Sequence, residues 1–515
     1  MQACRKLTVV PVIVCEPESA VTWTPQEEPW LNELLRSYPG GMHGNRETRG
    51  LDSDYAMRTY VPTALDESLY KRITDRSVAL IILCGNAGDG KTAFLQHLAS
   101  RLGINSVSSA QRIWEETLDD GLQIYANLDG SAAYNGRAAE ELLDELFAPF
   151  LDGHAPSNRV HLLAINSGPL LAWIEQQQER TLLESQLESA LECELNDLPT
   201  WLSFVDLNAR SLVGGMDNQG RLSTDFLDRL FEKMLGLDHA WSRCSSCTAQ
   251  TRCPSWSSVR TLRNPLQGEI LRRRLYSAVQ AVHQRGEIHA TARELRAALT
   301  YILFDVYECN DLHNDPNLSP ASLADRAFSP QSPFRQGEIL RELTLLDPAL
   351  EAHPAIDRQL RRENYGIKLG IARRQAYFAW SDEKIEQVGN NPGALALARG
   401  RHLQRFLEVP AMQEGERAAL CVALCQGIAR LEELPQLAFE CDPNSIPLRI
   451  TPRTPTESAF WVSKELDRFR LSAELPLVSE PVEQLHNTLR LTYTYGDGSE
   501  ETLLLGSELW TCPLN

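Results

Sequence analysis

The sequence predicts an α/β core with a parallel β-sheet, then a helical lid, a helical middle region and a small β-containing C-terminal module. Three observations indicate this order. Short apolar runs alternate with amphipathic helical patterns in residues 76–238, as in strand–helix–strand units. Helical periodicity dominates residues 259–435. Residues 436–515 contain apolar–polar alternation around an Asp-Gly turn, which is typical of a hairpin.

The composition is that of an ordinary globular chain with several domains. Its 515 residues are too many for one hydrophobic core. The formal net charge of −19 argues against attraction of the whole surface to nucleic acid. No apolar run approaches about 20 residues, so we expect no membrane span and no membrane partner. A cytoplasmic protein is therefore expected.

Residues 1–75 are expected to form an N-terminal extension. Its first segment, MQACRKLTVVPVIVCEPESA, has two basic residues before a short apolar run, as signal peptides do. Because the run is short and contains Pro11, we interpret it as an N-terminal strand instead.

A glycine-rich segment lies near the start of the predicted core. The sequence GNAGDGKT has the spacing Gly85-x4-Gly90-Lys91-Thr92 of a phosphate-binding loop, the Walker A motif. An apolar, β-branched run over 78–84 precedes it, and the helical pattern TAFLQHLASRL follows. A strand before the loop and a helix after it are the context that the motif requires. The residues expected to contact the nucleotide are Gly85, Asn86, Ala87, Gly88, Asp89, Gly90, Lys91, Thr92 and Ala93.

Each residue type in this loop is suited to the binding of phosphate groups or their metal ion. Glycines let the backbone turn so that its N–H groups point at phosphate oxygens. The helix N-terminus adds positive partial charge. We expect the Lys91 ammonium to reach the β- and γ-phosphates and the Thr92 hydroxyl to ligate Mg²⁺. The expected cofactors of this site are therefore ATP and Mg²⁺, and the α/β core is expected to be that of a P-loop NTPase.

Polar residues end three of the predicted strands, at Asp129, Asn166 and Asp206. Ligands of parallel sheets bind at the carboxyl ends of the strands. Asp129 is the first choice for the acid that supports Mg²⁺, because a helix and another strand follow it in the expected order, and Asp206 is the alternative. Gly130 and Leu207 follow these aspartates, so the glutamate that usually activates water is absent from its usual place. We therefore expect either slow ATP hydrolysis or a catalytic base that is supplied from elsewhere.

Asn166 and Arg210 have two interpretations each. Asn166 ends a buried strand, where it could hold the attacking water or the γ-phosphate, or form an Asx turn before Gly168-Pro169. Arg210 could reach a phosphate in its own subunit or in a neighbouring one, or be an ordinary surface arginine.

The order of the motifs along this chain resembles that of a known protein family. NLDGS, LLAINSG and VDLNARSL follow the loop, then a cysteine cluster, then HATARELRAALTYILF. Over about residues 60–304 the chain resembles the AAA-like and STAND-like P-loop ATPases of bacterial anti-phage defence and restriction operons, including BREX-type and DNA-phosphorothioation-dependent systems. The resemblance implies a core of the ASCE type and a sensor-1 role for Asn166. It also implies that Arg293, with Arg296 as second choice, contacts the γ-phosphate; a helix-surface arginine is the alternative.

A cysteine cluster predicts a metal-binding insert. Cys244-x2-Cys247-x5-Cys253 brings three thiols within ten residues, and His239 lies five residues upstream. Thiolates at this spacing chelate one metal ion through a tight turn, and His239 would complete a tetrahedral Cys₃His zinc site. An iron–sulfur cluster with a distant cysteine such as Cys193, or free thiols, are the alternatives.

The C-terminal half is expected to be mostly helical before its β module. A stretch rich in Pro, Asn and Ser over 310–333 is interpreted as a linker or an exposed insertion. The segment Arg358–Arg405 holds ten Lys or Arg residues against four acids, with aromatic residues between them. It could contact DNA through charge and stacking, but packing as an amphipathic face on the acidic core domain is preferred. The predicted boundaries are 1–75 (extension), 76–238 (core), 239–258 (cysteine-rich insert), 259–315 (helical lid), 316–435 (helical domain) and 436–515 (α+β module).

One functional expectation and two alternatives follow. We expect an ATP-binding, ATP-hydrolysing regulatory or motor subunit of a multi-protein bacterial system that defends against foreign DNA, a context that follows from the resemblance alone. A nucleotide-gated scaffold that scarcely hydrolyses ATP and recruits an effector protein is the first alternative, and a DNA-remodelling motor is the second. Other proteins of the same system are the expected partners, with DNA and a homo-oligomer also open. The expected catalytic residues are Lys91, Asp129, Asn166 and Arg293.

Overall fold

The computed structural model describes most of the chain. The described residues are 29–41, 50–104, 107–177, 181–195, 198–217, 220–236, 238–285, 289–331, 337–366, 368–398, 400, 402–431, 434, 436–440, 442–450, 461–473, 475 and 477–506. The N-terminal strand expected around Pro11 lies outside them.

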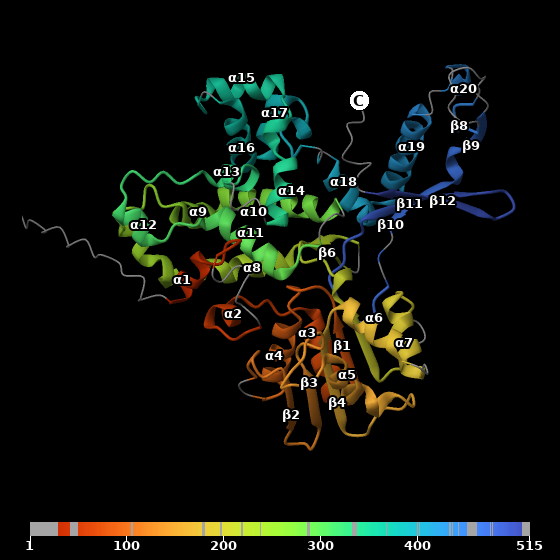
Figure 1. The fold of residues 1–515 in the computed structure, drawn as a ribbon. Helices are drawn as coiled ribbons and strands as arrows, with labels where there is room; N and C mark the ends of the chain where they lie inside the picture. The colour runs from red at the N-terminus through yellow and green to blue at the C-terminus, as the bar shows by residue number, and fades with distance from the viewer. Residues whose placement is uncertain are drawn as a thin grey trace, which may run out of the picture.

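A five-stranded sheet forms the centre of an α/β core, in the order β2-β3-β4-β1-β5 (Figure 1). β1, β3, β4 and β5 are parallel, whereas β2 pairs antiparallel with β3. The prediction of a parallel sheet is therefore confirmed for four strands and wrong for β2, because the turn between β2 and β3 is too short for a crossover. The strands are β1 Leu80–Cys84, β2 Ile113–Thr117, β3 Gln123–Asn127, β4 Arg159–Ile165 and β5 Leu202–Asp206.

Helices cover both faces of this sheet. All residues of β1 are buried, as expected for a central parallel strand. Ile81 and Leu83 pack with α3 and α4, whereas Leu80 and Ile82 pack with α5, α6 and α7 on the other face. The helices around the sheet are α3 Ala64–Thr74, α4 Lys91–Arg101, α5 Ala139–Phe147, α6 Ser167–Gln176 and α7 Leu182–Leu191. The short helix α2 Asp54–Thr59 precedes them and contributes Tyr55 to the hydrophobic cluster of the helical region.

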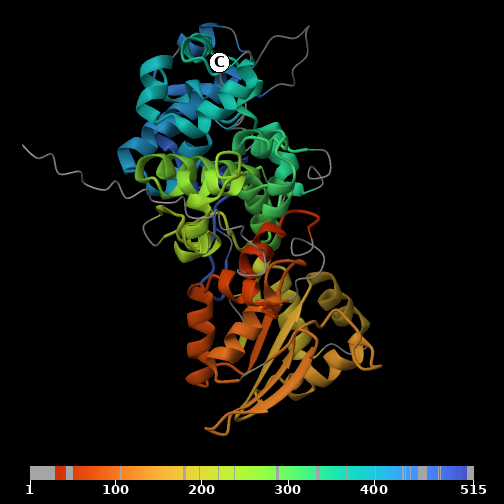
Figure 2. The ribbon, with the colours of Figure 1, turned by 90° about the vertical axis from the view of Figure 1, so that its left-hand side faces the viewer.

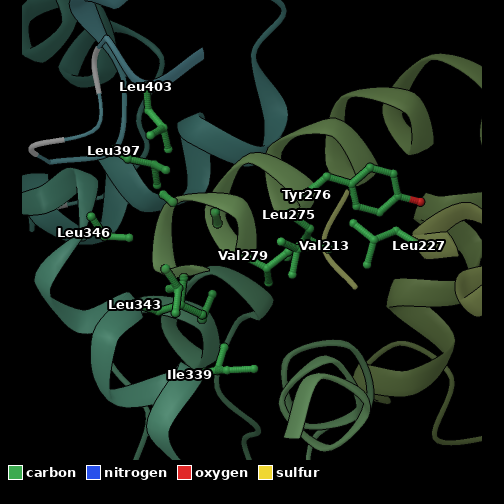
Figure 3. Packing of buried hydrophobic residues seen from close by; sticks show 14 of the residues in the cluster. Val213, Leu227, Leu275, Tyr276, Val279, Ile339, Leu343, Leu346, Leu397 and Leu403 are labelled. Carbon is green, nitrogen blue, oxygen red and sulfur yellow. The ribbon is translucent and has the colours of Figure 1, made fainter. Parts of the chain in front are cut away.

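A large helical region lies over one end of the sheet (Figures 1 and 2). One hydrophobic cluster runs through it, and Figure 3 shows Val279 of α10, Leu343 of α14 and Leu403 of α18 within that cluster. The helices that contribute to it include α1 Pro29–Leu35, α8 Asp225–Leu235, α9 Pro254–Arg263, α10 Pro265–Gln284, α11 Ala292–Phe304, α13 Leu323–Phe328, α14 Glu338–Leu345, α15 Pro354–Arg362, α16 Leu369–Ala379, α17 Asp382–Gly389, α18 Leu403–Glu408 and α19 Glu414–Leu431. Among the described helices, none is long and apolar enough to cross a membrane.

The stretch interpreted as a linker contains helices. α12 spans Cys309–Asn314 and α13 spans Leu323–Phe328. The Ser322 side chain caps α13 by accepting a hydrogen bond from Asp325 N. The residues that suggested a loop thus partly serve as caps and turns between two short helices, so the linker interpretation is wrong for these segments.

The C-terminal module contains two small sheets. β8 Ser445–Arg449 pairs with β9 Trp461–Glu465, and β10 Phe469–Ala473, β11 Thr488–Thr494 and β12 Glu500–Gly506 form an antiparallel sheet in that order. β11 and β12 meet at the Asp497-Gly498 turn, where Gly498 has a φ of +85°. The predicted hairpin is therefore confirmed.

The segment between β10 and β11 leaves this module and contacts the α/β core. We call its residues 477–487 the return segment. Ser203 Oγ on β5 donates to Glu480 Oε1 at 2.9 Å, and Ser68 Oγ on α3 donates to Glu480 Oε2 at 2.7 Å. The guanidinium of Arg72 also pairs with this carboxylate. The buried Glu480 therefore joins the C-terminal module to the core.

Candidate functional site

The glycine-rich loop connects β1 to the N-terminus of α4, as the motif requires. Gly90 is the N-cap of α4 and has a φ of +89°, in the left-handed region that glycine adopts at low cost. Gly88 has a φ of +105°, and a Cβ at this position would lie 2.9 Å from Thr291 Oγ1. Glycine at position 88 thus permits both the turn of the loop and the close approach of the N-terminus of α11.

Asp89 links the loop to the helical region. Its carboxylate accepts a hydrogen bond from Asn86 N at 2.5 Å, and its other oxygen lies 2.8 Å from His289 Nε2. Arg293 N, in the first turn of α11, donates to Gly88 O at 3.3 Å. The loop therefore contacts α11 through its backbone, and it contacts the segment just before α11 through the side chain of Asp89.

The contact between His289 and Asp89 is expected to depend on pH. Burial lowers the pKa of His289, but the hydrogen bond and the charge of Asp89 outweigh burial, so the pKa lies above its usual value. Because the pKa of His289 is higher in the folded state than in the unfolded state, its contact with Asp89 stabilises the fold fully below the unfolded-state pKa. This stabilisation is lost as the pH rises through the folded-state pKa of His289. NMR titration of histidine-labelled protein should find His289 titrating above its usual pKa, and Asp89→Asn should lower that value. A native His289 that titrates at or below its usual pKa would contradict this assignment.

Lys91 lies across the loop. Its Nζ donates at 2.8 Å to each of three oxygens, Gly85 O, Asn86 O and Asn166 Oδ1. Burial lowers its pKa, and the charges of Asp89 and Asp129 oppose that effect. The structure therefore brings together Lys91 and Asn166, the two expected catalytic residues that follow β1 and β4.

Thr92 and Asp129 face the same space. Thr92 Oγ1 donates to Leu128 O at 3.2 Å. Asp129, which directly follows Leu128, lines the same cavity as Thr92. Asp206, the alternative acid, accepts hydrogen bonds through Oδ1 from the main chain and side chain of Asn208, and it does not line the cavity. This arrangement favours Asp129 over Asp206, because Asp129 lines the cavity beside the loop.

The cavity between the core and the helical region has a volume of about 460 Å³. Its described lining carries five basic and two acidic side chains, an excess of three positive charges in a chain of net charge −19. No glutamate is among these lining residues. The basic residues are Lys91, Arg112, Arg210, Arg293 and Arg296, and the acidic residues are Asp89 and Asp129.

One part of the cavity is apolar. Its lining residues come from the segment before α3, from the segment after β5 and from α8. Aromatic and aliphatic walls of this kind suit a flat heterocyclic ring. The apolar lining residues of these three segments include Leu51, Ala56, Tyr60, Val61, Leu212, Phe226 and Leu230.

The arginines of the cavity differ in their partners. Arg210 Nε lies 2.9 Å from Glu483 Oε2 of the return segment, and its side chain is 10% exposed, so it is not an ordinary surface arginine. Arg296 Nη1 donates to Thr59 Oγ1 at 3.1 Å. Arg293 lines the cavity from the first turn of α11, beside Gly88. Arg293 and Arg210 therefore reach the cavity from two different elements.

Sequence reasoning missed three residues of this site. Arg112 lies 4.0 Å from Asp129, His289 binds Asp89, and Ser131 Oγ accepts a hydrogen bond from Asn166 N at 3.2 Å. Only Arg112 lies outside the motifs quoted above. Ser131 ends NLDGS, two residues after Asp129, and His289 begins HATARELRAALTYILF, so their positions in these motifs were the available signal.

The three clustered cysteines lie in or just after η5, which spans Asp238–Ser246, and at the N-cap of α9. The side chain of His239, the expected fourth ligand, lies outside the described residues. Cys193 follows α7 on the α/β core. Among the described residues, no three or more His, Cys, Asp or Glu side chains already stand in a metal-binding arrangement.

The basic segment Arg358–Arg405 forms many contacts within the helical region. Arg373 pairs with Asp357 at 2.7 Å, and Arg374 pairs with Asp347 at 2.6 Å. The preferred packing interpretation thus holds with a correction, because these two arginines pair with acids of the helical region and not with the acidic core domain. Tyr377, Phe378 and Trp380 are buried and are not available for base stacking.

No family model matches this chain, and no match was found among curated proteins or solved structures.

Proposed function

We propose that this protein binds ATP with Mg²⁺ in the cavity between the α/β core and the helical region. The observation that carries the proposal is the loop Gly85–Thr92, which opens onto a cavity with an excess of three positive lining charges. A polyanion is the ligand that such a lining favours, and the loop supplies backbone N–H groups for phosphate oxygens. The apolar part of the cavity would take the base.

The residues present fit a magnesium nucleotide. The Thr92 hydroxyl and the Asp129 carboxylate are hard oxygen donors that line one cavity, and Mg²⁺ prefers such ligands. When bound, Mg²⁺ would neutralise charge on the phosphates. Lys91 has three oxygen partners that phosphate oxygens would replace. Arg293 would add positive charge from α11.

The strand order supports a core of the ASCE type. β4, which ends before Asn166, lies between β1 with the loop and β3 with Asp129. This places Asn166 beside Lys91, where a side-chain amide could orient a water or a γ-phosphate oxygen. The proposed activity is ATP hydrolysis in a regulatory or motor subunit of a multi-protein system, and defence against foreign DNA is proposed from the resemblance alone.

A nucleotide-gated scaffold with little hydrolysis is the second candidate. The observation that favours it is the absence of glutamate among the described lining residues, since a glutamate usually activates the attacking water. Asp89 is engaged with Asn86 and His289, which leaves Asp129 as the other lining carboxylate. Nucleotide state would then act through the contacts of the loop with α11.

Asp129 and Asp206 make a matched pair for testing the metal role. We expect Asp129→Asn to weaken Mg²⁺-dependent ATP binding about tenfold, since it removes one charged oxygen ligand. Asp206→Asn should leave this dependence unchanged, because Asp206 does not line the cavity. Binding titrations with and without Mg²⁺ measure the difference. An effect of Asp206→Asn alone would transfer the role to the alternative acid.

Steady-state phosphate release separates the two candidates. Turnover that Lys91→Ala abolishes would support an ATPase, and stimulation of that turnover by double-stranded DNA would support coupling to DNA. Saturable ATP binding without phosphate release would support the scaffold. Release that is equal in the native chain and Lys91→Ala would contradict a catalytic role of this loop.

A further inference from the structure

Four cysteine side chains gather where η5, α9 and α12 meet, outside the nucleotide cavity. Cys244 lies in η5, Cys247 directly follows it, and Cys253 is the N-cap of α9. Cys309 is the first residue of α12, which is distant from these three in sequence. All four are partly buried.

Direct contacts hold the cysteine turn against α12. Arg252 Nη1 donates to Asp315 O at 2.8 Å, and the same guanidinium binds Leu312 O. Cys247 Sγ lies 3.4 Å from His313 Nε2. Because Cys309 and His313 are four residues apart on a helix, they share the face of α12 that the turn covers.

The four thiols are neighbours. Cys309 is within electrostatic range of Cys253, Cys244 and Cys247, and Cys244 is within range of Cys253 and Cys247. The contact between Cys247 and His313 places this set against α12. Thiols gathered in this way become stable thiolates when a cation lies among them.

We propose that Cys244, Cys247, Cys253 and Cys309 bind one structural zinc ion. Cys309 takes the place that the sequence assigned to His239. Binding converts four thiols to thiolates and releases four protons, so the Zn²⁺ site carries a net charge of −2. The four side chains have to close around the ion, and each cysteine has one side-chain torsion, χ1, for this movement. Four protein ligands fill the tetrahedron, which is typical of a structural site.

His313 is a positioning residue and not a ligand in this proposal. Its Nε2 faces Cys247 Sγ at 3.4 Å, and its Nδ1 lies 3.5 Å from Thr248 Oγ1, so both ring nitrogens face the turn. A ring N–H directed at a thiolate sulfur stabilises its negative charge.

The ion would tie the start of the helical region to α12. Residues 244–253 precede α9, and Cys309 follows α11, so the site closes a loop that contains α9, α10 and α11. α11 carries Arg293 into the nucleotide cavity. Zinc would therefore stabilise the helical unit that contributes to that cavity, although zinc binding itself does not depend on nucleotide binding.

Metal analysis of the purified full-length chain tests the proposal. We expect one zinc per chain in the native protein and in His239→Ala, and loss of zinc in Cys309→Ser. Cys193→Ser is the matched control, because Cys193 is exposed and lies on the α/β core. It should retain one zinc. Cobalt substitution of the native chain should give the absorption of a tetrahedral site with four sulfur ligands.

A second variant keeps the test valid if Cys309→Ser does not fold. Cys309→His offers a nitrogen ligand at the same position, so it should keep one metal ion and shift the cobalt d–d bands to shorter wavelength. Retention of zinc by folded Cys309→Ser, or loss of zinc in His239→Ala, would overturn the ligand set. A native chain without metal, or with iron and sulfide, would overturn the zinc site.

Discussion

Lys91→Ala is expected to reduce ATP affinity about 10- to 100-fold. The substitution removes a charged donor from the proposed phosphate site, and hydrogen bonds to charged groups contribute about 1.5–3 kcal/mol. The native ammonium would exchange three protein oxygens for phosphate oxygens on binding, so the expected loss is limited to this range. Titration calorimetry with a slowly hydrolysed ATP analogue measures the change.

Lys71→Ala is the matched control for this variant. Lys71 is exposed on α3 and does not line the cavity, but its removal changes the net charge by the same amount. Its affinity should equal that of the native chain. Equal losses in both variants would mean that overall charge, and not the loop, determines binding.

Glu480→Ala is expected to destabilise the junction between the return segment and the core by about 2–3 kcal/mol. The variant removes a carboxylate that is 5% exposed and leaves Arg72 and Ser203 without this partner. Breaking a buried ion pair by removing one partner is strongly destabilising, and partial exposure of Arg72 moderates the cost. Limited proteolysis should detect earlier cleavage within residues 477–487.

Glu501→Ala provides the comparison for Glu480→Ala. Glu501 pairs with Lys464 on the module surface, where its side chain is 67% exposed, and such pairs contribute little. Its proteolysis pattern should match that of the native chain. If Glu480→Ala is as resistant as Glu501→Ala, the buried carboxylate does not hold the return segment.

The residues of the loop could be identified from sequence because their signal is local. Glycines, lysine and threonine at fixed spacing between a strand and a helix specify one backbone path. The expected residues Lys91, Asp129 and Asn166 converge for a topological reason, since the ends of neighbouring parallel strands meet at one edge. Arg293 reaches the same cavity from α11. Strand order then places Asn166 beside Lys91.

The missed contacts are those between distant segments. Glu480 is separated from Ser68 by 412 positions, and His289 from Asp89 by 200. Their segments carry no periodicity that would indicate a partner. Cys309, the proposed fourth zinc ligand, was missed for the same reason. The spacing of metal ligands is informative within the short turn but not across three helices. β2 was missed because apolar and polar residues alternate only weakly along this strand, which lies at an exposed edge of the sheet.

Hydrogen–deuterium exchange with and without Mg²⁺-ATP tests the central claim most directly, since it locates the ligand on the chain. We expect nucleotide to protect residues 85–93 and the start of α11 around Arg293, while exchange in α15 and α16 stays unchanged. Loss of this protection in Lys91→Ala would confirm that the loop holds the phosphates. Unchanged exchange of residues 85–93 at saturating nucleotide would contradict ATP binding in this cavity.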